Sequence, residues 1–239
     1  MDEKEGAAMS VLSEKVRFHM GSRAVTVYGH PDPEVVFLQP VDDHDEEALD
    51  GEIAYMEQRT NQPFLLCAVK INQWGQELSP WSAPPVFGKE AFGDGAQETL
   101  DFIKDTLIPE LKSRYHIQEN AEFILGGYSL AGLFALWCGY QTRLFSGVAA
   151  ASPSVWFPGW VDYAKTHAFN PGKVYLSLGD KEAKTRNPVM ATVADCILEQ
   201  LEIFQEAGTA AVLEWNQGNH FKEADVRTAK AFLHFLQKV

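Results

Sequence analysis

The sequence contains little cysteine and no long apolar run. Only three of its 239 residues are cysteines: Cys67, Cys138 and Cys196. They lie in apolar surroundings at unrelated spacings, which excludes a disulfide framework or a paired-cysteine metal site and predicts three small buried side chains. No apolar stretch approaches the ~20 residues that a membrane-spanning helix requires. We therefore expect neither a membrane partner nor a bound metal.

Basic residues are scarce relative to acidic ones. The chain has 20 lysines and arginines against 33 aspartates and glutamates, a formal net charge of −13. Nucleic acid and anionic lipid would both be repelled, which argues against either as a partner. The acidic segment Met1–Glu5 lacks the apolar core of a secretory signal. Together with the unpaired cysteines, it indicates a cytoplasmic location.

What the chain does contain is enough apolar sequence for one large core. Hydrophobic residues make up 46% of the composition, and no internal repeat, linker or low-complexity tract interrupts them. We expect a flexible leader over residues 1–13 and a single domain over residues 14–239. The sequence does not indicate the oligomeric state.

Short apolar runs alternate with amphipathic segments along the chain. The pattern predicts a hairpin over residues 15–28, buried strands over 34–39, 64–71, 123–125, 147–152, 173–178 and 210–215, and helices over 46–60, 96–114, 190–207 and 221–237. Strands that alternate with helices form a mostly parallel sheet covered by helices on both faces. The predicted class is therefore α/β.

The segment Phe123–Trp137 passes from a buried strand to an apolar helix through Gly-Tyr-Ser-Leu-Ala-Gly. Its spacing resembles the nucleophile elbow of α/β-hydrolases, with Ala131 where a second glycine is usual. Small residues are needed there because the strand and helix backbones nearly touch on either side of Ser129. The alternative is a serine that only caps a helix.

An acid and a histidine follow Ser129 in the order that α/β-hydrolases use. The loop after the strand at 173–178 contains Asp180 and Glu182. An acid three residues beyond the strand-ending glycine is usual in these folds, which favours Glu182, with Asp180 as the alternative. His220 stands between the last predicted strand and the last predicted helix. Carboxyl ends of parallel strands meet at one edge, so these groups are expected to converge.

Four motifs together resemble the putative esterase family of α/β-hydrolases. They are the elbow, Ser-Pro-Ser-Val-Trp-Phe at 152–157, Gly-Asp-Lys-Glu at 179–182 and Gly-Asn-His-Phe at 218–221. The family includes esterase D, S-formylglutathione hydrolases, feruloyl esterases and enterochelin-type siderophore esterases, and the motifs are most similar to the siderophore branch. The resemblance spans residues ~34–239. It implies an α/β-hydrolase fold and hydrolysis of carboxylic esters without a cofactor.

The expected oxyanion hole departs from the family pattern. Where the family has a His-Gly or Asp-Gly pair, this chain reads Leu-Gln-Pro-Val-Asp over residues 38–42. Pro40 has no N–H, so the expected donors are the backbone N–H groups of Val41 and Leu130.

Aromatic residues follow several of the predicted strands. Trp74, Trp81, Tyr128 and Trp156 are candidates for the walls of an acyl or aryl pocket, although each could equally pack in the core. Only about twenty residues separate Ser152 from the next strand, too few for a large lid domain. We therefore expect an open site for a small-molecule ester.

The residues together predict a serine esterase that works through an acyl-enzyme. Ser129 would be the nucleophile, His220 the base and Glu182 the orienting acid. An acyltransferase or a peptidase could use the same three groups, and the altered oxyanion segment also leaves room for a non-catalytic binding protein.

Overall fold

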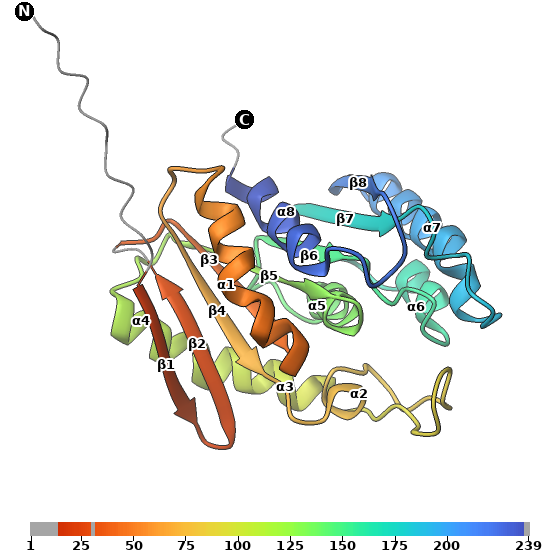
Figure 1. Cartoon of the computed structure of the whole chain (residues 1–239), viewed down its shortest axis with the longest axis horizontal. Helices are drawn as coiled ribbons and strands as arrows, with labels where there is room; N and C mark the ends of the chain where they lie inside the picture. Colours follow the sequence, from red (N-terminus) through yellow and green to blue (C-terminus); the bar gives the residue numbers. More distant parts are fainter. Residues whose placement is uncertain (1–13, 30–31, 237–239) are drawn as a thin grey trace, which may run out of the picture.

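The computed structural model describes residues 14–29 and 32–236, so the expected leader at 1–13 lies outside the described residues. Figure 1 shows one twisted sheet with helices packed on both faces. Its eight strands run in the order β1-β2-β4-β3-β5-β6-β7-β8. Their bounds are β1 Glu14–Met20, β2 Arg23–Gly29, β3 Val35–Val41, β4 Phe64–Lys70, β5 Glu122–Tyr128, β6 Gly147–Ala151, β7 Lys173–Gly179 and β8 Ala210–Asn216.

The sheet is antiparallel at one edge and parallel everywhere else. The hairpin β1–β2 pairs antiparallel with β4, and all strands from β4 to β8 run parallel. Strands β3, β5 and β6 are buried almost throughout because helices cover both of their faces. The mostly parallel sheet predicted from the sequence is confirmed.

Two helices cover one face of the sheet and the remaining helices cover the other. Helices α1 (Asp43–Glu57) and α8 (Ala224–Leu236) pack on each other and on β3 to β7. The opposite face carries α3 (Ala96–Phe102), a π-helical turn (Ile103–Leu107), α4 (Ile108–Tyr115), α5 (Leu130–Gln141), α6 (Trp160–Thr166) and α7 (Val193–Glu206). A short helix α2 (Trp74–Glu77) and a 3₁₀ turn (Met190–Thr192) complete the described elements.

Several helix boundaries differ from those predicted. Helix α1 begins at Asp43 rather than Glu46, because the Asp42 side chain accepts the Asp45 N–H at 2.9 Å and caps the first turn. Helix α8 begins at Ala224 rather than at residue 221, after Glu223 takes a positive φ of 53°. Helices α2 and α6 were not predicted, since four and seven residues are too short to show a clear period.

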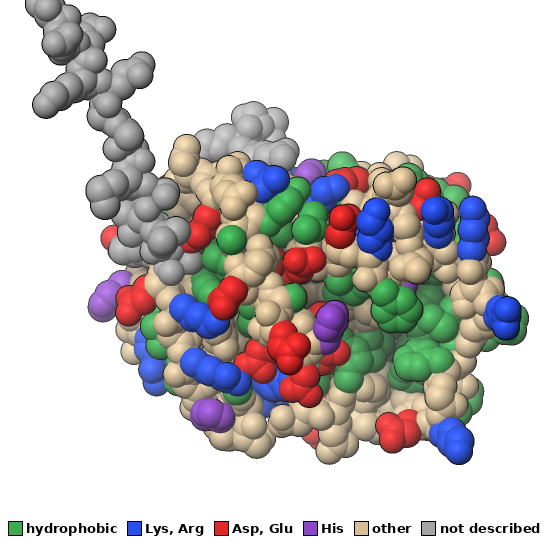
Figure 2. Space-filling view, viewed as in Figure 1, with side chains coloured by type: hydrophobic (Ala, Val, Ile, Leu, Met, Phe, Trp, Pro, Cys, Tyr) green, Lys and Arg blue, Asp and Glu red, His purple; other side chains and the backbone are tan. Residues whose placement is uncertain are grey.

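No lid domain lies above the carboxyl ends of the strands in the described part of the chain. The segment between β6 and β7 contains only α6 as a regular element, as its length predicted. Figure 2 shows a hollow in the surface with hydrophobic side chains on its walls. Among residues 14–29 and 32–236, no helix is long and apolar enough to cross a membrane.

Candidate active site

Ser129 occupies a sharp turn between β5 and α5. Its backbone has φ 57° and ψ −119°, a conformation that non-glycine residues rarely adopt. A Cβ atom at Gly127 would come within 2.7 Å of the Ala131 Cβ atom. Ala131 stands where a second glycine is usual. It fits there because Gly127, on the other side of the turn, has no side chain. Strain of this kind is typical of functional turns.

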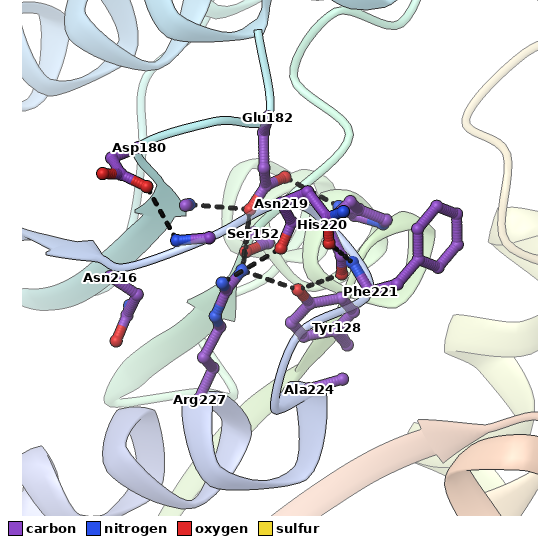
Figure 3. Close-up of polar contacts among 12 residues, drawn as sticks. Tyr128, Ser152, Asp180, Glu182, Asn216, Asn219, His220, Phe221, Ala224 and Arg227 are labelled. Atoms are coloured by element: carbon purple, nitrogen blue, oxygen red, sulfur yellow. Dashed lines mark hydrogen bonds and ion pairs between the residues drawn. The ribbon is translucent and has the colours of Figure 1, made fainter. Parts of the chain in front are cut away.

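The structure brings Ser129, His220 and Glu182 into one hydrogen-bonded series. His220 Nε2 lies 3.0 Å from Ser129 Oγ, and His220 Nδ1 lies 2.7 Å from Glu182 Oε2. When Nδ1 carries the hydrogen and donates it to the carboxylate, Nε2 is free to accept from the serine hydroxyl. Figure 3 shows His220 and Glu182 facing each other above α8. The arrangement can transfer a proton from Ser129.

Glu182 is buried, and hydrogen bonds hold both of its carboxylate oxygens. Oε1 accepts from Gly179 N at 2.7 Å, from Ser152 Oγ at 2.7 Å and from Arg227 Nη1 at 2.9 Å. Burial by itself would raise the pKa of Glu182. The hydrogen bonds from His220, Ser152 and Gly179 outweigh burial and lower that pKa below its usual value. The carboxylate is therefore ionised at neutral pH.

Asp180, the alternative acid, faces another partner. Its side chain is exposed, and Oδ1 accepts the Gly218 N–H at 2.7 Å. The neighbouring backbone is tied down as well, since Asp180 N donates to the Asn216 carbonyl. The structure therefore does not bring the Asp180 carboxylate to His220; Asp180 fixes the loop that carries the histidine.

Arg227, Ser152 and Ser154 lie at the site, although the sequence did not predict a site role for any of them. Arg227 is 1% exposed and contacts Glu182 from α8. Ser152 donates to Glu182, and Ser154 Oγ lies 3.3 Å from Ser129 Oγ. The Ser-Pro-Ser motif at 152–154 was a usable signal for the serines. For Arg227 the only signal was its place four residues before Ala231, on the buried side of a predicted helix.

A cavity of about 740 Å³ opens beside Ser129. The residues on its walls come from the loop after β4 and helix α2, from the loop before α3, from the turn between β5 and α5, and from the turn after β6. They are Asn72–Gln76, Phe87–Phe92, Ser129, Leu130, Ser154 and Trp156. Phe87, Phe92 and Trp156 form an aromatic wall, with ring centroids 5.9 to 6.3 Å apart. The cavity can hold a small organic molecule against the serine.

Two of the four predicted pocket aromatics line this cavity and two do not. Trp74 and Trp156 lie on its walls. Trp81 instead packs against Phe157, Trp160 and Tyr163 and donates its indole N–H to the Pro158 carbonyl. The structure therefore does not bring Trp81 to the cavity wall; its ring packs, partly buried, against the core.

Tyr128 also lies away from the cavity. Its hydroxyl donates to the His220 carbonyl at 2.6 Å and accepts from Arg227 at 3.1 Å, below the histidine. Burial raises the pKa of Tyr128 to about 12, so it stays protonated and remains a donor. The structure therefore does not bring Tyr128 to the cavity wall; its hydroxyl contacts the histidine loop instead.

The two expected oxyanion donors differ in their placement. Leu130 lines the cavity as the first residue of α5, where a backbone N–H has no partner within the helix. Val41 ends β3, and its carbonyl accepts the Ile71 N–H on the β4 side at 2.9 Å. In an extended strand the N–H and C=O of one residue point the same way. The Val41 N–H thus faces β4, away from Ser129, and this expectation is corrected.

Comparisons with known proteins identify the family and the fold. A family model described as "Esterase: Putative esterase" matches residues 67–228, more than half of the chain. The structure is similar to siderophore hydrolase EstB from Aspergillus nidulans, with a TM-score of 0.74 and 16% identity over 98% of this chain and 97% of EstB. It is also similar to an IroE-like serine hydrolase from Shewanella oneidensis, with a TM-score of 0.74 and 16% identity over 93% and 79% of the two chains.

A third similar structure is the enterobactin esterase FES from Shigella flexneri. Its TM-score is 0.66 and its identity 15%, over 96% of this chain and 60% of FES. At such identities the likeness is one of fold. A search of curated proteins finds no match.

Proposed function

Because the chain belongs to the putative esterase family of α/β-hydrolases and is a carboxylic ester hydrolase, we propose that it cleaves its substrate through an acyl-enzyme on Ser129. His220 is the general base and Glu182 the acid that orients it. One observation carries the proposal: the hydrogen-bonded series from Ser129 Oγ through both ring nitrogens of His220 to Glu182 Oε2.

In the first half-reaction, His220 Nε2 takes the Ser129 hydroxyl proton while Oγ attacks the ester carbonyl carbon. The imidazolium that forms keeps its Nδ1–H on the Glu182 carboxylate, 2.7 Å away. Nε2–H then gives its proton to the departing alcohol oxygen. The products of this step are the free alcohol and an ester between the acyl group and Ser129 Oγ.

In the second half-reaction, water replaces the serine as nucleophile. His220 takes a proton from the water as it attacks the acyl carbonyl, and returns a proton to Ser129 Oγ as that bond breaks. The carboxylic acid leaves and the serine is regenerated. Both half-reactions pass through a tetrahedral oxyanion, for which the Leu130 N–H is the proposed donor; one such donor is typically worth about 3 kcal/mol.

The proposed substrate is a small ester with an apolar, ring-containing part. The cavity of about 740 Å³ beside Ser129 has an aromatic wall of Phe87, Phe92 and Trp156, with Trp74 also on its walls. Flat rings pack edge-to-face against such a wall. Similar structures include siderophore hydrolases, enterobactin esterases and a ferulic acid esterase, which agrees with this class of substrate.

We also propose a cytoplasmic location, on the chemistry of the cysteines. All three are free thiols; Cys67 and Cys138 are buried as predicted, whereas Cys196 is only partly buried. Burial raises the pKa of each of these thiols, which keeps them protonated and unreactive. Free thiols of this kind fit a reducing compartment.

A fluorophosphonate probe tests the nucleophile. We expect peptide mapping to find the label on Ser129 in the wild type, and no label in Ser129→Ala, which should also lose hydrolysis of p-nitrophenyl esters. Ser146→Ala is the matched control, because Ser146 is an exposed serine whose hydroxyl donates to the Phe123 carbonyl.

Two outcomes would contradict the proposed function. One is a label on a different serine, and the other is full ester hydrolysis by Ser129→Ala. Amide substrates and alcohol acceptors in the same assay distinguish hydrolysis of esters from peptidase or acyltransferase activity.

A further inference from the structure

Arg227 is a fully buried cation whose place in the fold the proposed mechanism leaves unexplained. Its side chain is 2% exposed, and it extends from α8 into the space beneath the Glu182–His220 pair (Figure 3). Burying a charged group away from water is costly unless ion pairs and hydrogen bonds compensate. The contacts of the guanidinium therefore indicate what it is held there to do.

One nitrogen of the guanidinium faces the acid. Arg227 Nη1 lies 2.9 Å from Glu182 Oε1, 3.1 Å from the Tyr128 hydroxyl and 3.3 Å from Ser152 Oγ. Ser152 and Gly179 donate to the same Oε1 atom, so three donors surround it. The carboxylate cannot rotate without breaking these bonds, and its other oxygen, Oε2, is left facing His220.

The other terminal nitrogen faces the loop that carries the base. Arg227 Nη2 donates to the carbonyl of Gln217 at 3.3 Å and to that of Asn219 at 3.0 Å. Through Tyr128, whose hydroxyl donates to the His220 carbonyl, Nη1 reaches the same loop a second time. A single planar group thus joins the β7–α7 loop to the β8–α8 loop.

The third nitrogen of the guanidinium is left without a hydrogen bond in the described part of the chain. Arg227 Nε is buried and has no hydrogen-bond partner among the described residues. A buried donor without a partner is destabilising. The guanidinium is therefore oriented so that its two terminal nitrogens contact the two loops, although this leaves Nε without a hydrogen bond to any residue that the structure describes. Such an orientation is expected of a group that positions the active site.

We propose that Arg227 is a positioning residue for ester hydrolysis: its guanidinium fixes Glu182 Oε2 and the His220 loop relative to each other. This inference rests on the proposed function, in which Glu182 and His220 act on Ser129. Arg227 does not touch the substrate. It acts by holding the 2.7 Å contact between the acid and His220 Nδ1 in place during both proton transfers.

The fork of the guanidinium matters as well as its charge. Lysine presents one compact ammonium, which can pair with a carboxylate but cannot span Glu182 and two carbonyls of another loop in one plane. Arg227→Lys therefore keeps the cation and removes the link, whereas Arg227→Met removes both. The two variants separate the electrostatic contribution from the geometric one.

Lys230→Met on the same helix is the matched control. Lys230 lies one turn further along α8, where it pairs with Glu214 at 2.6 Å and donates to Asn216 Oδ1. Its removal deletes an ion pair of α8 without touching Glu182 or His220. The experiment measures kcat and KM for a p-nitrophenyl ester across pH, the rate of fluorophosphonate labelling, and unfolding in urea for all four proteins.

We expect Arg227→Lys to lower kcat by about tenfold or more, since small misplacements of catalytic groups have effects of that order, with KM nearly unchanged. The acidic limb of its kcat/KM profile should stay where the wild type has it, because the cation remains. In Arg227→Met the limb should move to higher pH. Without the buried cation, the Glu182 anion in contact with His220 Nδ1 favours the imidazolium with one opposing charge fewer. Tyr128 stays neutral in each variant.

The proposal is overturned if Arg227→Lys equals the wild type in kcat and labelling rate, because the link between the loops is then unnecessary. It is also overturned if folded Arg227→Met keeps the wild-type kcat and acidic limb. Where Arg227→Met does not fold, Arg227→Lys alone decides. Failure of the proposed function would look different: the wild type itself would not be labelled on Ser129.

Discussion

The Glu182 carboxylate and the His220 imidazole are 38 residues apart in the chain and 2.7 Å apart in space. Only one of the two acids in the β7–α7 loop makes this contact. Asp180, two residues earlier, turns outward and accepts the Gly218 N–H. The two carboxylates therefore lie in the same loop but have different partners. Glu182 contacts His220, and Asp180 holds the β8–α8 loop that carries His220.

Replacing each acid by its amide should separate these roles. We expect Glu182→Gln to lower kcat by about a thousandfold or more, because a neutral amide cannot stabilise the imidazolium and can hold the wrong tautomer. Asp180→Asn should change kcat by less than about tenfold, since its amide oxygen can still accept one hydrogen bond from Gly218 N. Steady-state kinetics on both variants measures the difference. The reverse ranking would transfer the acid role to Asp180.

The base should be identified by comparing two histidines. His220→Ala should lose nearly all turnover, because no other ring nitrogen lies against Ser129 Oγ in the described structure. His234→Ala should keep it, since His234 lies on α8 with its ring against Tyr175 and Phe235. In the wild type and in His234→Ala, activity should fall on acidification as the base becomes protonated. Turnover in His220→Ala with the same acidic limb would show that another group is the base.

The close contact beneath Ser129 predicts a pair of compensating substitutions. Gly127→Ala would place a methyl group 2.7 Å from the Ala131 Cβ atom, which should destabilise the fold by about 1–3 kcal/mol and reduce labelling of Ser129. Ala131→Gly alone should cost only about 1 kcal/mol, as glycine does in a helix. The double variant should recover part of the stability lost in Gly127→Ala. Urea unfolding tests this, and strictly additive losses would refute the contact as the cause.

Glu52 and Gln39 form a buried pair that predicts how stability depends on pH. Gln39 Nε2 donates to Glu52 Oε2 at 3.2 Å, while Oε1 of each residue has no partner within the described part of the chain. Burial raises the pKa of Glu52 to about 8, against the smaller opposing effect of the Gln39 hydrogen bond. A proton on Glu52 Oε1 would let it donate to Gln39 Oε1 and satisfy both oxygens at once.

Because the folded pKa of Glu52 lies above its usual 4.5, its contribution to stability is fully present below pH 4.5 and is lost as the pH rises to about 8. Glu52→Gln can make the same two hydrogen bonds without a proton. Its stability relative to the wild type should therefore increase by up to about 1.4 kcal/mol per pH unit over this range and level off above it. Urea unfolding at several pH values measures the difference, with Glu47→Gln, exposed on the same helix, as control. Parallel curves for Glu52→Gln and the wild type would contradict the prediction.

Local sequence determined the architecture. Apolar runs such as Phe64–Lys70 and Lys173–Gly179 predicted buried strands, and the amphipathic segments between them predicted helices that cover the sheet, so the α/β class and the mostly parallel sheet followed from pattern. The turn at Ser129 could also be predicted from the sequence, because it depends on a few small residues that are adjacent in the chain. The patterns that predicted these features lie in residues close together in the chain.

Tertiary structure decided how the groups at the carboxyl edge face one another. The sequence alone does not distinguish the two acids of one loop. In the folded protein Asp180 accepts the Gly218 N–H, and Glu182 is the acid that contacts His220. The direction of the Val41 N–H was set by the pairing of β3 with β4. In the sequence Arg227 does not differ from other arginines in helices. Its hydrogen-bond partners come from the loops after β7 and β8, which only the fold brings to it. Side-chain periodicity reports burial, whereas the direction of a hydrogen bond depends on partners that the chain brings together only when it folds.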